Sequence, residues 1–170
     1  LIVLDNLLMS FAPSGLTSYT IPDSITVIGE AAFTGNDELI SIFLNNNITT
    51  IQDSAFYLCT NLKSINIPEC ILTIESAAFY NCSSLKSVYC TATTPPSLGN
   101  SSVFVNNGSG RKIYVPAISL DAYQTSPYWS EYKDSFIAEG QFFYEDCGQT
   151  ITKDENGYWT FTTDKDFKVM

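Results

Sequence analysis

The sequence predicts a repeat solenoid, mainly β with short 3₁₀ or α turns, because several residue types recur every 23 positions. Phe33, Phe56 and Phe79 follow this interval, and further columns run in phase with them. These columns are Ala32, Ala55 and Ala78; Ile28, Ile51 and Ile74; Ile25, Ile48 and Ile71; Leu39, Leu62 and Leu85; and Ser18, Ser41, Ser64 and Ser87. A fixed period of about 20–50 residues is typical of arrays in which each unit buries its apolar face against its neighbours.

The unit from 62 to 85 shows how each stretch is expected to fold. Ser64–Ile67 alternates polar and apolar side chains, which predicts a half-buried strand that ends at Pro68. Ile71–Ile74 is expected to return along a second layer as a short extended or irregular segment. Ser76–Phe79 predicts a single 3₁₀ or α turn, in which the alanines let neighbouring coils approach and the phenylalanine fills the space between layers.

The columns also predict how the chain is organised. They lose phase before Leu16, and a fifth strand is expected near Ile113–Val115. The predicted segments are residues 1–15 as an N-terminal cap or degenerate repeat, 16–116 as the solenoid, 117–140 as a helical C-terminal cap, and 141–170 as a small β-hairpin tail or the start of a further domain.

The last coil of a solenoid needs a cover with a polar outer face. Helices are predicted at Ala117–Ser126 and at Tyr128–Ile137, with Pro127 between them. The second segment is rich in aromatic residues, which we interpret as cap core rather than as a platform for sugars. In the tail, Asn156-Gly157 lies between two alternating runs and predicts a hairpin, either docked on the solenoid or part of another β-domain.

Charge excludes some classes of partner. The 170 residues include 18 acidic and 8 basic side chains, for a net charge of −10. Such a surface repels nucleic-acid phosphates and anionic membranes, so neither is an expected partner. Leu1–Phe11 is apolar but too short to span a bilayer. Because the chain starts with leucine rather than methionine, we expect it to be processed or partial, with any export signal already removed.

The five cysteines leave the redox compartment open, because an odd number cannot all pair within one chain. Cys59 and Cys82 lie 23 residues apart in one column, where parallel side chains favour a buried thiol ladder over a disulfide. Cys90 is expected to be a small core residue. The array should therefore depend on its inner stack and not on disulfides.

No catalytic, metal or cofactor site is predicted. The chain has no histidine, which removes the common nucleophile–base pairs and the commonest zinc ligand. Asp164-Lys165-Asp166 offers only two carboxylates, a poor calcium site. Paired carboxylates could still meet in space and hydrolyse a glycoside, so a carboxylate-based hydrolase is a remote alternative.

The ordered repeat of strand, proline, two isoleucines, Ala-Phe, cysteine and leucine resembles the BspA-like leucine-rich repeats of bacterial cell-surface proteins. The matching segments are Ile21-Pro22, Ile67-Pro68, Gly29–Phe33, Cys59 and Cys82, and the stretches Ile113–Pro116, Asp121–Tyr123 and Tyr128-Trp129 are similar to the ending such arrays carry. The resemblance covers roughly residues 16 to 140.

This resemblance implies a curved, right-handed leucine-rich-repeat solenoid that serves surface adhesion or recognition, and it carries over no catalytic residue. The sequence departs from the pattern at Leu44-Asn45 and Cys90-Thr91, which lack the proline, and at Asn36, which replaces the corner cysteine. These departures fall in turns and leave the core columns intact. A bacterial, extracellular or cell-surface location is the matching expectation.

Two outward columns are the predicted ligand-binding face. The candidate residues are Ser41, Phe43, Ser64, Asn66, Ser87, Tyr89 and Tyr114. Exposed aromatics in a row on a concave sheet are typical of solenoid binding surfaces. In the opposing interpretation, aromatics merely favour strands and the serines hydrogen-bond along their column.

We therefore expect a non-enzymatic extracellular recognition or adhesion module, monomeric as a fragment, whose concave β-face binds a protein or glycan. The alternative is a structural spacer that holds a neighbouring domain away from the cell. If the tail covered Phe43 and Tyr89, the case for recognition would lose its main support.

Overall fold

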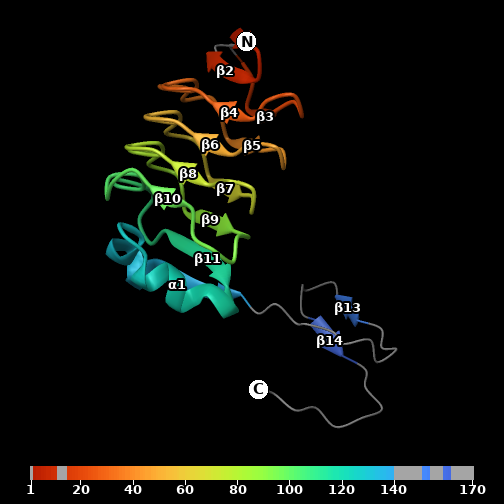
Figure 1. The fold of residues 1–170 in the computed structure, drawn as a ribbon, viewed down its shortest axis with the longest axis vertical. Coiled ribbons are helices and arrows are strands. Elements are labelled where there is room, and N and C mark those ends of the chain that lie inside the picture. Colours follow the sequence, from red (N-terminus) through yellow and green to blue (C-terminus); the bar gives the residue numbers. More distant parts are fainter. Residues whose placement is uncertain (1, 11–14, 140–150, 154–158, 162–170) are drawn as a thin grey trace.

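The computed structural model describes residues 2–10, 15–139, 151–153 and 159–161. Figure 1 shows a stack of coils with the N-terminal strands at one end and helix α1 (Leu120–Thr125) at the other. Each coil contributes one short strand to each of two sheets, and a turn closes its third side. The fold is thus a mostly β repeat array, as the sequence predicts.

We call the two sheets the rear sheet and the front sheet. The rear sheet contains β1 (Ile2–Leu4), β2 (Leu7–Ser10), β4 (Val27–Ile28), β6 (Thr50–Ile51), β8 (Thr73–Ile74) and β10 (Ser97–Leu98). The front sheet contains β3 (Ser18–Thr20), β5 (Ser41–Phe43), β7 (Ser64–Ile67), β9 (Ser87–Cys90), β11 (Lys112–Pro116) and β12 (Phe136–Glu139).

The strands pair in register along the columns. Ser18 lies opposite Ser41 and Ser64 opposite Ser87 in the front sheet, and all pairings of neighbouring coils are parallel. The front sheet consists of two ladders, β3–β5 and β7–β9–β11–β12, which meet where the Lys63 amide donates to the Ile40 carbonyl at 3.1 Å. The second layer, expected to be extended or irregular, is extended: its two-residue strands form a continuous rear sheet.

The third side of each coil is a run of turns and not the helical turn that was expected. In the first unit the amides of Ala32 and Thr34 bond three residues back within the coil. The intervening amides of Ala31 and Phe33 donate instead to carbonyls of the next coil. Because every second amide is used between coils, a helix cannot propagate there.

Repeated corners need a left-handed backbone. Gly35, Leu58 and Asn81 occupy equivalent positions with φ of 71°, 60° and 59°. Only glycine reaches this region without cost, and asparagine tolerates it better than leucine does. Asn81 therefore serves as a corner residue.

The predicted phenylalanine stack is confirmed. Phe33, Phe56 and Phe79 are fully buried, with ring centroids 4.8 and 5.0 Å apart. Phe104 extends the stack at 5.4 Å although it follows Phe79 by 25 residues rather than 23. Trp129 of the cap lies 5.7 Å beyond it and is tilted by 39°, which closes the column.

The cap departs from the two predicted helices. Residues 117–125 form a 3₁₀ turn, Ala117–Ser119, followed by α1, close to expectation. The second segment is a 3₁₀ helix, Trp129–Ser135, that gives way to strand β12 at Phe136. This correction has a physical cause: β11 leaves an open edge, and parallel pairing with Phe136–Glu139 satisfies its backbone groups.

Three aromatic residues of the cap are core residues, whereas Tyr128 is 44% exposed, so most of the cluster packs inward as the cap-core interpretation expects. Trp129, Tyr123 and Tyr132 are at most 7% exposed. Trp129 Nε1 donates to the Pro96 carbonyl at 2.7 Å, and the Tyr123 hydroxyl donates to the Ala92 carbonyl at 3.0 Å. Each of these hydrogen bonds joins the cap to the long turn of the fourth unit.

Strands near both ends of the chain also pair with a neighbouring strand. β1 folds antiparallel on β2, and β2 pairs parallel with β4, so that buried Leu8 lies opposite Ile28. In the tail, β13 (Ile151–Lys153) and β14 (Trp159–Phe161) pair antiparallel where the hairpin is predicted. The turn at Asn156-Gly157 and the Asp164–Asp166 segment lie outside the described residues.

The inner stack should dominate stability. We expect Phe56→Ala to lower the free energy of unfolding by ~3–5 kcal/mol, because it removes the middle ring of the buried column. Chemical denaturation followed by circular dichroism measures the loss. Phe43→Ala is the matched control, since Phe43 is 56% exposed, and it should cost far less. Equal losses in the two variants would contradict the assignment of the two faces.

Candidate recognition surface

The predicted ligand-binding residues all lie on the outward side of the front sheet. Between them the strands alternate with buried Ile42, Ile65, Val88 and Ile113, which face the core. The serine column and the second column are therefore on the side expected from the alternation.

The second column contains an aromatic row, which we define as Phe43, Tyr89 and Tyr114. Phe43 is 56% exposed, and the rings of Tyr89 and Tyr114 stack with centroids 4.6 Å apart and an angle of 14° between their planes. Asn66 lies opposite Tyr89 on the adjacent strand, between Tyr89 and Phe43 in the row. Ile137 of β12 lies opposite Tyr114 and continues the row, although the sequence predicted a helix there.

The serine column offers only hydroxyl groups, in contrast to the mixed side chains of the second column. The Ser41 hydroxyl donates to the Ser18 hydroxyl at 3.0 Å, and Ser64 lies opposite Ser87. Ser41, Ser64 and Ser87 are half-buried. Part of the opposing interpretation therefore holds, because hydroxyls do bond along this column.

Lysines beside this surface were not among the predicted site residues. Lys63 and Lys86 are exposed and lie 23 residues apart, each directly before a serine of the column. The Lys86 amide donates to the Lys63 carbonyl at 3.0 Å, and the Lys112 amide donates to the Lys86 carbonyl at 2.8 Å, so the three follow one another on successive coils. Their spacing was the available signal, but it spans too few copies to be recognised as a column.

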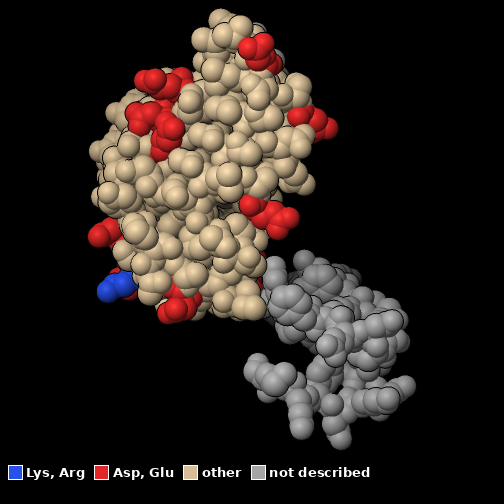
Figure 2. Space-filling view, in the orientation of Figure 1, with Lys and Arg blue, Asp and Glu red and all other residues tan. Residues whose placement is uncertain are grey.

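Two of these lysines, Lys63 and Lys86, border a hollow of about 540 Å³, which we call the basic hollow. Lys63, Lys86, Tyr89 and four serines line it, and none of its lining residues is acidic. This contrasts with the face of the molecule in Figure 2, where carboxylates are scattered and basic side chains are almost absent.

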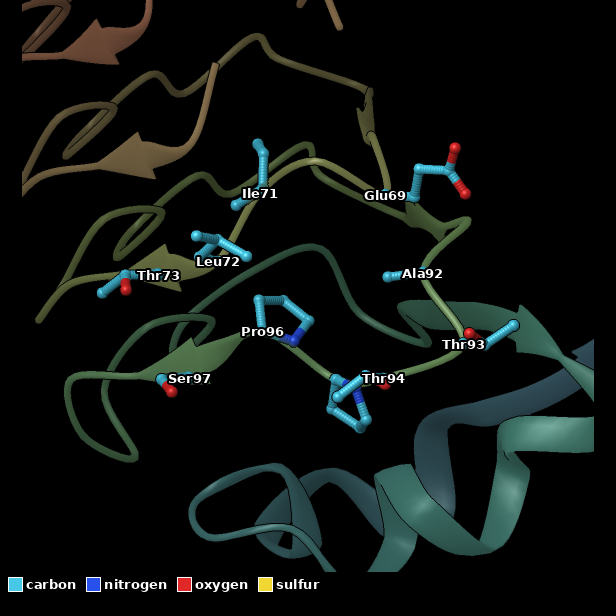
Figure 3. A pocket seen from close by; sticks show the side chains of 10 residues that line it. Glu69, Ile71, Leu72, Thr73, Ala92, Thr93, Thr94, Pro96 and Ser97 are labelled. Atoms are coloured by element: carbon cyan, nitrogen blue, oxygen red, sulfur yellow. The ribbon is translucent and has the colours of Figure 1, made fainter. Parts of the chain in front are cut away.

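A second hollow lies beside the long turn of the fourth unit, with a volume of about 500 Å³. Figure 3 shows Leu72 and Pro96 in its middle, with Glu69 and Thr93 toward one end. Leu72 is 65% exposed. The lining offers threonines, prolines and the single carboxylate of Glu69, so it lacks the pair of carboxylates that glycoside hydrolysis uses.

Arg111 belongs to the cap and not to a site. Its Nη1 donates to the Phe104 carbonyl and to Asn107 Oδ1, and the guanidinium carbon lies 4.9 Å from the centre of the Tyr132 ring. Burial lowers the pKa of this guanidinium, while the nearby Tyr132 opposes the shift. The side chain thus joins the fourth unit to the cap through hydrogen bonds and a cation–π contact.

The cysteines form no disulfide in the described part of the chain. Cys59 and Cys82 are fully buried free thiols, as predicted, and donate to the carbonyls of Phe33 and Phe56, each at 3.1 Å. Burial raises the pKa of Cys59 well above its usual range and raises that of Cys82 to about 12. Cys90 is a buried core thiol whose pKa burial also raises to about 12.

Among the residues that the structure describes, no three His, Cys, Asp or Glu side chains are grouped closely enough to hold a metal ion. In the same part of the chain, no helix has the length and apolar character needed to cross a bilayer.

Comparison with known families agrees with this geometry. The family model of the BspA type leucine rich repeat region matches residues 9–128 in six copies. The chain belongs to this family. A search of curated proteins gave no match. Membership indicates a protein-interaction or surface module, from a family that is generally non-enzymatic and is associated with bacterial surface proteins.

We expect the buried thiols of this leucine-rich-repeat array to resist modification. In the folded protein at about pH 8, Cys59, Cys82 and Cys90 should not react with iodoacetamide, because raised pKa values keep them protonated. Peptide mapping by mass spectrometry measures the labelling, and a denatured sample should be labelled at all three. Protection lost in the native state would contradict the buried assignment.

The raised pKa of Cys82 also predicts that the stability of the fold depends on pH. The unfolded Cys82 thiol ionises near its ordinary pKa of 9.0, whereas the folded thiol stays neutral to about 12. Its contribution to stability is therefore complete below about pH 9 and declines as the pH rises toward 12. The stability difference between the wild type and Cys82→Ala, measured by urea denaturation, should shrink over that interval and stay constant below it.

Proposed function

We propose that this chain is a non-enzymatic, extracellular recognition or adhesion module whose front sheet binds a protein or glycan. The observation that carries the proposal is the aromatic row, because it presents a largely exposed Phe43 and a stacked tyrosine pair on one sheet face. We take the array to be right-handed and this face to be concave, as usual for parallel crossover connections and for repeat arrays.

Composition of the face supports binding over simple strand propensity. Large aromatic side chains contribute disproportionately to interface affinity. The other outward side chains of β5, β7 and β9 are serines and Asn66, which are polar and short, so the rings project beyond them. Neither Phe43 nor Tyr89 belongs to the inner stack, which leaves both free to serve recognition.

A structural spacer is the competing function. The architecture of the array is compatible with a spacer function. In-register backbone hydrogen bonds between successive coils make the array stiff, and this stiffness does not depend on which residues occupy the outward columns. A spacer has no need of exposed aromatics, however, and burial against a partner is the usual reason for such a row. A carboxylate-based hydrolase has no support among the hollows described above.

Removing the aromatic row should abolish binding without unfolding the protein. We expect Phe43→Ser/Tyr89→Ser to lose binding to whichever protein or glycan the wild type captures on matrix-protein and glycan arrays. The thermal midpoint should change little, because Phe43 is 56% exposed and Tyr89 lies outside the core.

The matched control is Leu72→Ser/Ile118→Ser, which removes two exposed apolar side chains, at 65% and 70%, one elsewhere on the array and one in the cap. It should bind as the wild type does. Unchanged affinity in a folded Phe43/Tyr89 variant would move the site away from the front sheet. Silence of the wild type on both arrays, with the surface protein active, would favour the spacer.

A further inference from the structure

The basic hollow stands out because it concentrates positive charge in a chain with a net charge of −10. Lys63 and Lys86 are exposed on neighbouring coils, with Lys112 on the next. No carboxylate of the described residues forms an ion pair with any of these three lysines. Like charges on adjacent strands repel one another, so an anion held between them is favoured.

An aromatic wall adjoins these charges. One face of the Tyr89 ring stacks on Tyr114, and the other faces the β7 side, where the short Asn66 lies opposite Tyr89. Tyr89 also lines the basic hollow. The hollow and the aromatic row are therefore parts of one surface.

The row leaves a gap above Asn66. Phe43 and Tyr89 lie on β5 and β9, with β7 between them, so their strands are about 9.6 Å apart at the usual spacing of about 4.8 Å. Stacked ring centroids are about 4.5–7 Å apart, which leaves space for one flat ring between the two side chains. The Asn66 side chain is exposed at the floor of this gap and has no hydrogen-bond partner among the described residues.

We propose that this surface binds an acidic saccharide, with a sugar ring over Asn66 between Phe43 and Tyr89 and a carboxylate at Lys63 and Lys86. Asn66 lies three positions after Lys63, about 10 Å along an extended chain, which a lysine side chain and a di- or trisaccharide span together. The Asn66 amide and the serine hydroxyls supply donors and acceptors for sugar hydroxyls. This inference rests on the proposed function and names the ligand class for the same surface.

An acidic peptide is the weaker fit. It would use the lysines equally well, but it has no flat polyhydroxylated ring for a gap with an aromatic wall on either side and an amide below. The combination of charge, slot and free amide is what favours the saccharide.

Isothermal titration calorimetry tests the inference with four probes. 3′-Sialyllactose and a glucuronate-containing hyaluronan tetrasaccharide carry the carboxylate on different sugars, lactose is the neutral counterpart, and a glutamate hexapeptide carries charge alone. We expect at least one acidic saccharide to bind at least tenfold more tightly than lactose and the hexapeptide. The better of the two identifies the source of the carboxylate.

Variants then assign the contacts. Lys63→Gln/Lys86→Gln should weaken acidic-saccharide binding at least tenfold and flatten its dependence on salt, because the charged partners are gone. Lys133→Gln, an exposed lysine of the cap, is the matched control and should bind as the wild type does. Asn66→Ala should weaken binding while leaving the salt dependence intact.

The outcomes separate this inference from the proposed function. Unchanged affinity in Lys63→Gln/Lys86→Gln, or equal binding of the glutamate hexapeptide, overturns the acidic-saccharide assignment. If no acidic saccharide binds but an array partner is captured and then lost in Phe43→Ser/Tyr89→Ser, the ligand class is wrong and the recognition role stands. If both sets of probes are silent, both proposals fail.

Discussion

The spacing between successive coils is the constraint on which the rest of the structure depends. Parallel backbone hydrogen bonds hold neighbouring strands about 4.8 Å apart on the front and rear sheets. The turns obey the same spacing, because alternate amides there donate to the next coil. Side chains in one column must therefore stack at that distance, and the Phe33–Phe56 centroid separation of 4.8 Å matches it.

Departures from the repeat are tolerated where they do not alter that spacing. Asn45 stands where the proline occurs in other units, and its side-chain amide donates to the Pro22 and Ile25 carbonyls of the previous coil. Asn36 stands where the corner cysteine occurs, and its side-chain oxygen accepts from the Leu39 amide. In both cases the substituted side chain makes hydrogen bonds of its own to nearby backbone groups.

The fourth unit changes the spacing itself and so ends the array. Its long turn places Phe104 at 5.4 Å from Phe79, wider than the pairs before it. The amide of Phe104 then donates to the Tyr132 hydroxyl of the cap at 3.1 Å rather than to a further coil. A cap that supplies both ring contacts and hydrogen bonds thus takes the place of the next repeat.

The residues of the buried columns repeat from coil to coil, so the residue types vary mainly in the outward-facing columns. The core positions repeat because each must fit the same space, whereas the outward column changes from Thr20 to Phe43, Asn66, Tyr89 and Tyr114 without cost to the ladder. Binding of one ligand at a particular place on the array needs residues that distinguish that place from the other repeats. The candidate surface therefore consists of outward residues that vary from coil to coil, on a core whose residues repeat.

The sequence alone determined the array, its core columns, the outward face of the strands and the free buried thiols, because a fixed period and strict alternation leave each residue one environment. Tertiary structure decided what depends on neighbours across the fold. Phe136–Glu139 is a strand and not a helix because β11 offers an open edge, and the turns are not helical because their amides serve the next coil. Likewise, Lys63 and Lys86 gain significance only when adjacent coils bring them, Tyr89 and the gap above Asn66 into one surface. Periodicity fixes local environments, whereas edges, caps and hollows arise only when the coils are assembled.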